Sequence, residues 1–140
     1  MEKEVGKSNF VEVFYDAEAK LYHSRYLPAT IDMTDQEWRD QMMELKKIFE
    51  KYRPEYIIDD NRERLYGYSP EMQEWTLNLF TALWNRINLK KYAQILPKEI
   101  IGKLTSMQIE EMAVNDFEMQ YQYKMVEDYE SALSWINEGK

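Results

Sequence analysis

Two segments near the start of the chain, 10–15 and 20–27, alternate hydrophobic and polar residues with the period of a β-strand. In the first segment, Val11 and Val13 fall on one face and Glu12 falls on the other. Both segments carry polar residues on each face, which is typical of strands at the edge of a sheet. The pattern therefore predicts an N-terminal β-hairpin that forms a sheet edge.

The segment 34–52 has the hydrophobic spacing of an amphipathic helix. It opens with a capping box from Thr34 to Glu37, in which the hydroxyl and the carboxylate each satisfy a backbone N–H group. Hydrophobic residues then recur at intervals of three and four, so they form one stripe that faces a core. Pro54 is expected to end this helix.

A second helix is predicted from Ser69 to about residue 88. Ser69 is suited to the N-cap position, and Pro70 is suited to the first helical position. The hydrophobic residues of this helix, which include Phe80 and Trp84, cover more than half of its circumference. One contact with a sheet does not use so wide an arc. The arc is either ordinary core, a partner or dimer surface, or the wall of an apolar ligand pocket.

Three further strands and two further helices complete the pattern. Residues 56–58 form a short apolar run that ends in two aspartates, as expected of a central strand buried on both faces. Residues 92–96 predict another strand, and residues 121–126 alternate like an edge strand. Helices are predicted within 105–117 and from Asp128 onward.

Strands that alternate with helices favour a parallel sheet covered on both faces. We therefore predict an α/β fold with a four- to five-stranded, mixed and mostly parallel sheet, to which the N-terminal hairpin adds an antiparallel edge. Residues 1–8 are polar and are expected to be a lead-in without a core role. Residues 9–140 are expected to form a single domain, since their number suits one hydrophobic core.

Charge and composition narrow the range of partners. The net charge is −8, whereas a surface that neutralises phosphates is basic, so nucleic acid and anionic membranes are not expected partners. No apolar run approaches the ~20 residues that span a bilayer. Residues 1–8 lack the apolar core of a signal peptide, so a cytoplasmic location is expected.

The sequence carries few of the residues that common catalytic sites need. It has no cysteine, and His23 is its only histidine, which excludes thiolate nucleophiles and metal sites built on two histidines. Its four glycines do not form a phosphate-binding loop, and no G-x-S-x-G motif occurs. We therefore expect a protein that is not an enzyme and that has no cofactor and no metal.

The charged segment 59–69 is the main candidate for a functional site. It leaves the carboxyl end of a predicted central strand and enters a helix N-terminus, a place where α/β sheets bind ligands and anions. Asp59, Asp60 and Glu63 would suit Mg²⁺, but the arginines between them favour ordinary salt bridges. Ser69 is either a modifiable hydroxyl or simply a helix cap.

The arrangement of these segments resembles the SpoIIAA-like, or STAS-like, proteins, in particular small stand-alone members common in Bacteroidetes. The resemblance rests on residues 10–27, 34–52, 56–60, 69–75 and 92–97. In the anti-sigma-factor antagonists of that family, a kinase phosphorylates a serine at the start of the helix after the central strand, and Ser69 has the matching position. The small Ser-Ser-Gly-Leu-Gly turn of the family is replaced here by a longer charged loop. Related proteins are similar in their sheet to Sec14-type lipid carriers.

These observations lead to three hypotheses for the function. The first is a non-enzymatic interaction or regulatory module that binds a protein partner, or a second copy, through the 59–69 loop and the following helix. The second is a carrier or sensor of a small apolar ligand, and the third and least favoured is a carboxylate-based enzyme. A closed pocket lined by Trp75, Phe80 or Trp84 would favour the second. The candidate site residues are Asp59, Asp60, Arg62, Ser69, Phe80 and Trp84.

Overall fold

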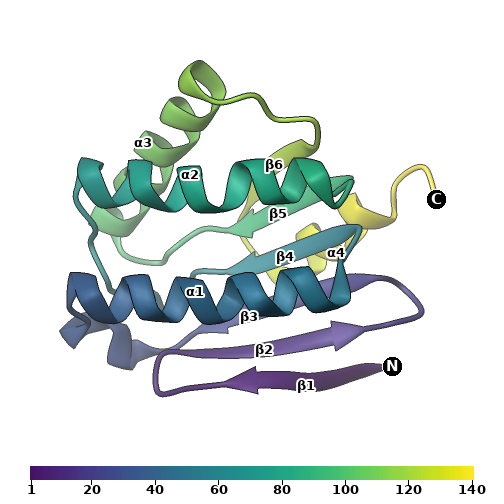
Figure 1. Ribbon diagram of the computed structural model, residues 1–140, viewed down its shortest axis with the longest axis horizontal. Coiled ribbons are helices and arrows are strands. Elements are labelled where there is room, and N and C mark those ends of the chain that lie inside the picture. Colours follow the sequence, from purple (N-terminus) through teal and green to yellow (C-terminus); the bar gives the residue numbers. More distant parts are fainter.

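A computed structural model describes the chain from Met1 to Lys140. Its centre is one six-stranded sheet, in which the strands follow one another in space as they do in sequence (Figure 1). The strands are β1 (Glu2–Lys7), β2 (Val11–Asp16), β3 (Leu21–Tyr26), β4 (Tyr56–Asp60), β5 (Lys91–Ile95) and β6 (Gln122–Val126). The helices are α1 (Asp35–Tyr52), α2 (Pro70–Arg86), α3 (Ile100–Asp116) and α4 (Tyr129–Asn137), with a 3-10 turn at Pro28–Asp32.

The sheet is mixed, as predicted. Strands β1, β2 and β3 form an antiparallel meander, and β3, β4, β5 and β6 run parallel to one another. Each parallel strand is reached through a helix, because a parallel neighbour needs a long crossover connection. The α/β class is thus confirmed, whereas the predicted number of four to five strands is wrong.

The additional strand is β1, which occupies most of the segment predicted as a polar lead-in. Glu2–Lys7 pairs with β2 along its length, with an irregularity between Glu4 and Gly6. The first three residues of β1 are charged and exposed. Charged residues are common on edge strands because they discourage pairing with other chains. This composition lacks the hydrophobic alternation by which a strand is recognised, so the pattern of residues 1–8 did not reveal it.

The hairpin of β2 and β3 is present, but β3 is not an edge strand as expected. It pairs with β2 on one side and with β4 on the other, and five of its six residues are buried. Its polar residues His23 and Ser24 therefore lie inside the molecule, where each needs a hydrogen-bond partner. Ser24 finds its partner on β4, which becomes important for the candidate site.

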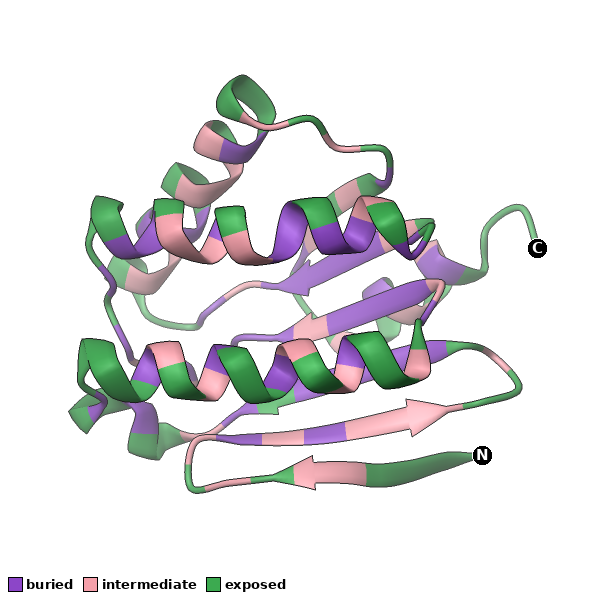
Figure 2. Ribbon diagram, viewed as in Figure 1, coloured by how far each residue is buried: buried purple, intermediate pink, exposed green.

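The helices cover both faces of the sheet. Helices α1 and α2 lie side by side in front of the sheet, and α4 lies behind it (Figure 1). The sheet is buried chiefly along β3, β4 and β5, while the outward sides of α1 and α2 are exposed (Figure 2). Two hydrophobic clusters result, a larger one under α1 and α2 and a smaller one under α4.

The ends of the helices follow the signals in the sequence. The Glu37 N–H donates to Thr34 Oγ1 at 3.1 Å, and the Thr34 N–H donates to Glu37 Oε1 at 2.9 Å, so the predicted capping box is formed. α3 begins at Ile100, earlier than the predicted 105–117. None of the helices has the length and apolar composition needed to cross a membrane.

Candidate functional site

A row of polar side chains crosses the three central strands near their carboxyl ends. The parallel register pairs Ser24 of β3 with Asp59 of β4, and it pairs Asp59 with Gln94 of β5. The neighbouring row on the same face consists of Tyr22, Ile57, Tyr92 and Tyr123. Since alternate residues of a strand share a face, both rows lie under α1 and α2.

A cavity of about 80 Å³ lies over these rows, between the sheet and helices α1, α2 and α3. Most of the residues that line it are hydrophobic or aromatic, and Phe80 and Trp84 are among them. The polar and charged residues of its wall are Ser24, Asp59, Asn61, Arg64, Thr76, Gln94 and Glu110. An apolar cavity with a few convergent polar groups is the usual form of a small-molecule site.

Asp59 is held in the wall of the cavity by two hydroxyl groups. Tyr92 Oη donates to Asp59 Oδ2 at 2.5 Å, and Ser24 Oγ donates to Asp59 Oδ1 at 3.1 Å. Burial raises the pKa of Asp59 above its ordinary value, although these hydrogen bonds and the positive charge of Arg64 partly oppose the effect. A further polar link joins Tyr123 Oη to Gln94 on the same wall.

Arg64 brings a buried positive charge to the same cavity. Only 3% of the residue is exposed. Its Nη1 donates to Asn61 Oδ1 at 2.9 Å, its Nη2 donates to Ser106 Oγ at 3.3 Å, and its guanidinium lies 5.2 Å from the centre of the Tyr68 ring. These partners are all neutral. Arg64 is also not among the residues that pair with a carboxylate within 4.0 Å.

Three buried polar atoms around the cavity have no hydrogen-bond partner. They are Tyr22 Oη, Arg64 Nε and Trp84 Nε1, and each belongs to a residue that lines the cavity. A buried donor without a partner costs about 1–3 kcal/mol, so such groups are rare in folded proteins. Three of them at one cavity are the arrangement expected of a site for a molecule that supplies its own acceptors.

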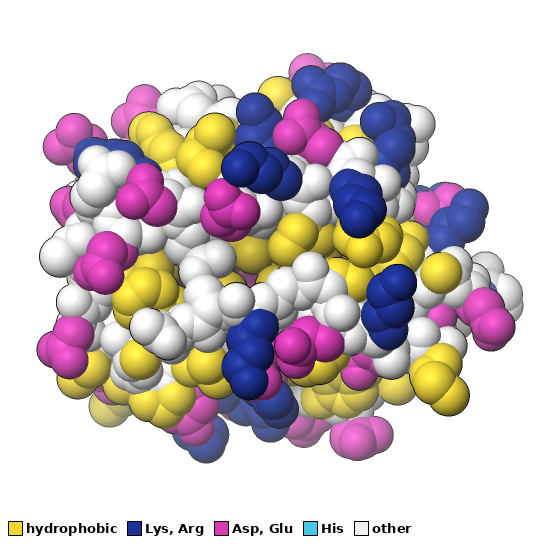
Figure 3. All heavy atoms as spheres, turned by 60° about the horizontal axis from the view of Figure 1, so that its bottom comes forward, with side chains coloured by type: hydrophobic (Ala, Val, Ile, Leu, Met, Phe, Trp, Pro, Cys, Tyr) yellow, Lys and Arg dark blue, Asp and Glu magenta, His cyan; other side chains and the backbone are white.

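A second hollow lies between β1 and α1, but it lacks these features. It is bordered by residues such as Val5, Ile48 and Lys47, and none of the unpartnered buried atoms belongs to it. Figure 3 turns the β1 edge toward the viewer and shows hydrophobic side chains interspersed with basic (Lys, Arg) and acidic (Asp, Glu) side chains. The cavity under α1 and α2 is therefore the candidate site.

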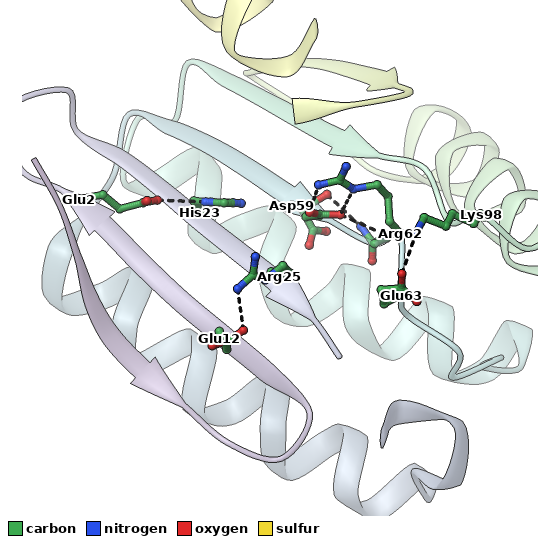
Figure 4. Close-up of polar contacts among 10 residues, drawn as sticks. Glu2, Glu12, His23, Arg25, Asp59, Arg62, Glu63 and Lys98 are labelled. Atoms are coloured by element: carbon green, nitrogen blue, oxygen red, sulfur yellow. Dashed lines mark hydrogen bonds and ion pairs between the residues drawn. The ribbon is translucent and has the colours of Figure 1, made fainter. Parts of the chain in front are cut away.

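Asp59, Asp60 and Glu63, the three acids that would suit Mg²⁺, do not come together at the end of β4, because the strand separates them. Asp59 and Asp60 are consecutive, so they lie on opposite faces of the sheet. Asp60 binds Arg62, with Oδ2 at 2.7 Å from Nη2 and Oδ1 at 3.0 Å from Nε. Glu63 instead pairs with Lys98 at 2.8 Å (Figure 4). The three carboxylates thus diverge, and no group of acidic residues is arranged to hold a metal ion.

Phe80 and Trp84 are buried and do not form an exposed aromatic patch. Their rings stack 5.2 Å apart, and both rings contact Phe49 of α1 edge-on. The wide hydrophobic arc of α2 is therefore used both as core and as part of the cavity wall. The packing of Phe49 against two aromatic residues fixes how α1 and α2 meet above the sheet.

His23 lies on the other face of the sheet, away from the cavity. Its Nδ1 is 2.9 Å from Glu2 Oε1 (Figure 4), and the centre of its ring lies 4.9 Å from that of the Tyr129 ring. β1 therefore supplies a polar partner for the only histidine of the chain.

Several residues of the cavity were not among the predicted site residues. Arg64 was considered only as a charge that neutralises the loop, and Ser24, Tyr92 and Gln94 were assigned to strands without a role. A signal was present, since Gln94 and Asp59 are polar residues in strands expected to be buried. Such residues need partners, so they mark polar sites within a core.

No protein-family model matches the chain, and neither a curated protein nor a solved structure matches it. The resemblance to SpoIIAA-like proteins therefore stays a prediction, and the function is argued from the geometry of the cavity.

The pKa shifts of Asp59 and Asp60 predict opposite effects of pH on stability. The pKa of Asp59 is higher in the folded state than in the unfolded state. As pH rises above 3.8, the carboxyl group therefore stays protonated in the folded protein after it has ionised in the unfolded chain, and the free energy of unfolding falls. Asp59→Asn should remove this fall. As pH rises, the free energy of unfolding of the variant should increase relative to that of the wild type, by at most about 1.4 kcal/mol per pH unit. Urea unfolding at a series of pH values measures it.

Asp60→Asn is the matched control, for which we expect the opposite change of stability with pH. Burial alone would raise the pKa of Asp60, but hydrogen bonds and charge from Arg62 lower it below 3.8. The wild type should therefore be more stable than Asp60→Asn above that pH and should lose this advantage as pH falls through the lowered pKa. Equal pH dependence of the two variants would contradict the assignment of the two aspartates to different environments.

Ser69 is exposed and serves as the N-cap of α2, where its Oγ accepts from the Met72 N–H at 3.3 Å. We predict that Ser69→Ala lowers the free energy of unfolding by about 1 kcal/mol, whereas Ser69→Asp, which caps as well as serine, preserves it. Urea unfolding tests both variants. If Ser69→Ala left stability unchanged and altered ligand or partner binding, Ser69 would be a regulatory residue rather than a cap.

Proposed function

We propose that this protein binds a small, largely apolar molecule in the cavity over β3, β4 and β5, and that it acts as a carrier or sensor of that molecule. The observation that supports the proposal is the set of unpartnered donors on a mostly apolar wall, namely Tyr22 Oη, Arg64 Nε and Trp84 Nε1. The role needs no chemical reaction, so it agrees with the expectation that the protein is not an enzyme.

The position and walls of the cavity support this function. It lies near the carboxyl ends of parallel strands, where the ligands of α/β sheets commonly bind. Rings such as those of Trp84 and Tyr92, whose centres are 4.8 Å apart, offer flat apolar surface. Asp59 and Gln94 offer polar atoms that orient a bound molecule. The observations favour this function over an interaction module that uses Phe80 and Trp84, because both of these side chains are buried.

Filling the cavity tests the proposal. Ala113 is buried on the inner side of α3 and lines the cavity, so Ala113→Leu should occupy the space that the ligand needs. Native mass spectrometry of protein purified from its own host should find a small molecule on the wild type and at least about tenfold less on the variant, a change of about 1.4 kcal/mol. Val114→Leu is the matched control, because Val114 is 62% exposed on the outer side of the same helix.

The control should keep the ligand at the wild-type level. A wild type that carries no small molecule, and that binds none of a library of small apolar compounds, would contradict the proposed function.

The outer side of α3 favours self-association as a second function. Ile100, Leu104, Met107 and Val114 are exposed there, and with Glu111 they repeat at intervals of four and three. This spacing is that of a coiled-coil seam, although Glu111 interrupts it. Soluble proteins rarely expose several large apolar side chains along one side of a helix unless that side is a binding surface.

The charges that flank this stripe favour a second copy of the chain as the partner. Lys103 and Glu110 are seven residues apart and lie on the same side of the stripe; both are half-buried, and Glu110 also borders the cavity. In an antiparallel pair of α3 helices, Lys103 of one copy lies opposite Glu110 of the other, and the symmetry repeats this ion pair. The stripe is therefore complementary to itself in both apolar surface and charge.

We predict that the wild type forms a dimer that Leu104→Glu weakens by at least about 30-fold, the effect of a 2 kcal/mol interface residue. Analytical ultracentrifugation measures the dissociation constant. Ile31→Glu is the control, because Ile31 is equally hydrophobic and 64% exposed but lies outside α3. The single variant Lys103→Glu should weaken the dimer. The double variant with both Lys103→Glu and Glu110→Lys should restore dimer affinity, because the ion pair is then re-formed with its charges exchanged. A monomeric wild type would overturn the second function.

A further inference from the structure

We infer that the molecule bound in the cavity carries a carboxylate, which binds the guanidinium of Arg64. This inference rests on the proposed ligand-binding function and specifies the chemical class of the ligand as a small apolar carboxylic acid. Two observations support it: the surroundings of Arg64, of which only 3% is exposed, and the chemistry of the cavity wall.

Arg64 donates hydrogen bonds only to neutral groups, although its charge also acts on the buried Asp59. Its Nη1 and Nη2 donate to the Asn61 amide oxygen and the Ser106 hydroxyl, and its Nε donates to nothing. Arginine remains protonated in proteins, so the group cannot lose its charge when it is buried. A buried charge is costly unless an opposite charge and hydrogen bonds compensate it. An anionic ligand would supply both.

The acids on the same wall do not take this role. Asp59 and Glu110 line the cavity, but neither is paired with Arg64 within 4.0 Å. The carboxylate of Asp59 is already bound by the hydroxyls of Ser24 and Tyr92. Arg64 is thus the charged group of the wall that still has an unused donor.

The remaining groups of the cavity select a monoanion with an apolar body. A guanidinium holds a planar carboxylate through adjacent N–H groups, and the ring of Tyr68 at 5.2 Å helps to orient it. Tyr22 Oη and Trp84 Nε1 are two further donors that have no acceptor. A dianionic phosphate is disfavoured, because only one buried cation faces it and two acids share the wall.

Matched pairs of an acid and its amide test the charge requirement directly. Butyrate and butyramide, and isovalerate and isovaleramide, are small enough for a cavity of about 80 Å³, and each pair has a similar shape and differs in charge. Titrations followed by ¹H–¹⁵N NMR would use the indole N–H of Trp84, assigned with Trp84→Phe, as a reporter inside the cavity. The wild type should bind the acid of at least one pair about tenfold or more tightly than its amide, as expected for a hydrogen-bonded charge.

Arg64→Gln removes the charge and keeps a polar side chain. It should weaken acid binding about 10- to 100-fold and change amide binding by less than about threefold. Arg64→Lys, which keeps the charge without the planar fork, should retain part of the preference. Arg62→Gln is the matched control, because Arg62 binds Asp60 on the other face of the sheet and should leave both affinities unchanged. If Arg64→Gln does not fold, the comparison of acid and amide on the wild type decides the question.

The possible failures are distinguishable. Equal binding of acids and amides, both detected at Trp84, would overturn the carboxylate inference and leave ligand binding in the cavity intact. No response of Trp84 to any acid, amide or neutral apolar compound would overturn the proposed function itself, and the inference with it.

Discussion

The fold depends on how polar side chains are accommodated on the buried face of a parallel sheet. Ser24, Asp59 and Gln94 form a row across three strands, and each must find a partner within the core. Tyr92 and Tyr123 supply hydroxyls to this row, and Ser106 on α3 accepts a hydrogen bond from Gln94 at 3.3 Å. Helices that meet a polar row of this kind cannot pack on it as they would on aliphatic side chains. A cavity with polar atoms in an aromatic wall is the result.

The two faces of the sheet differ because the strands distribute their residues by alternation. The face under α4 is built from small and aliphatic residues such as Ile58, Ala93 and Ile95, which are fully buried. The same alternation places Asp59 in the cavity and Asp60 beside Arg62 on the other face. Two adjacent aspartates thus have different environments, and their pKa values move in opposite directions.

Helix α3 connects the two functions that we propose. Its inner side contributes Ser106 and Ala113 to the surroundings of the cavity, and its outer side presents the apolar stripe that begins at Ile100. A helix that is apolar on both sides has no strong preference for a single neighbour. Arg64 donates a hydrogen bond to Ser106 of α3. A ligand that binds Arg64 would therefore affect the position of α3, the helix that also carries the proposed dimer surface.

The sequence by itself determined the features that depend on neighbouring residues. The capping box at Thr34, the cap at Ser69, the order of helices and strands after residue 10, and the α/β class all follow from local spacing and local hydrogen bonds. Only the tertiary structure decided that residues 2–7 form an edge strand, that β3 is internal and that Arg64 is buried at a cavity. The physical reason is that burial and pairing depend on segments far apart in the chain. A polar residue is recognised as part of a site only when the strands and helices around it are in place.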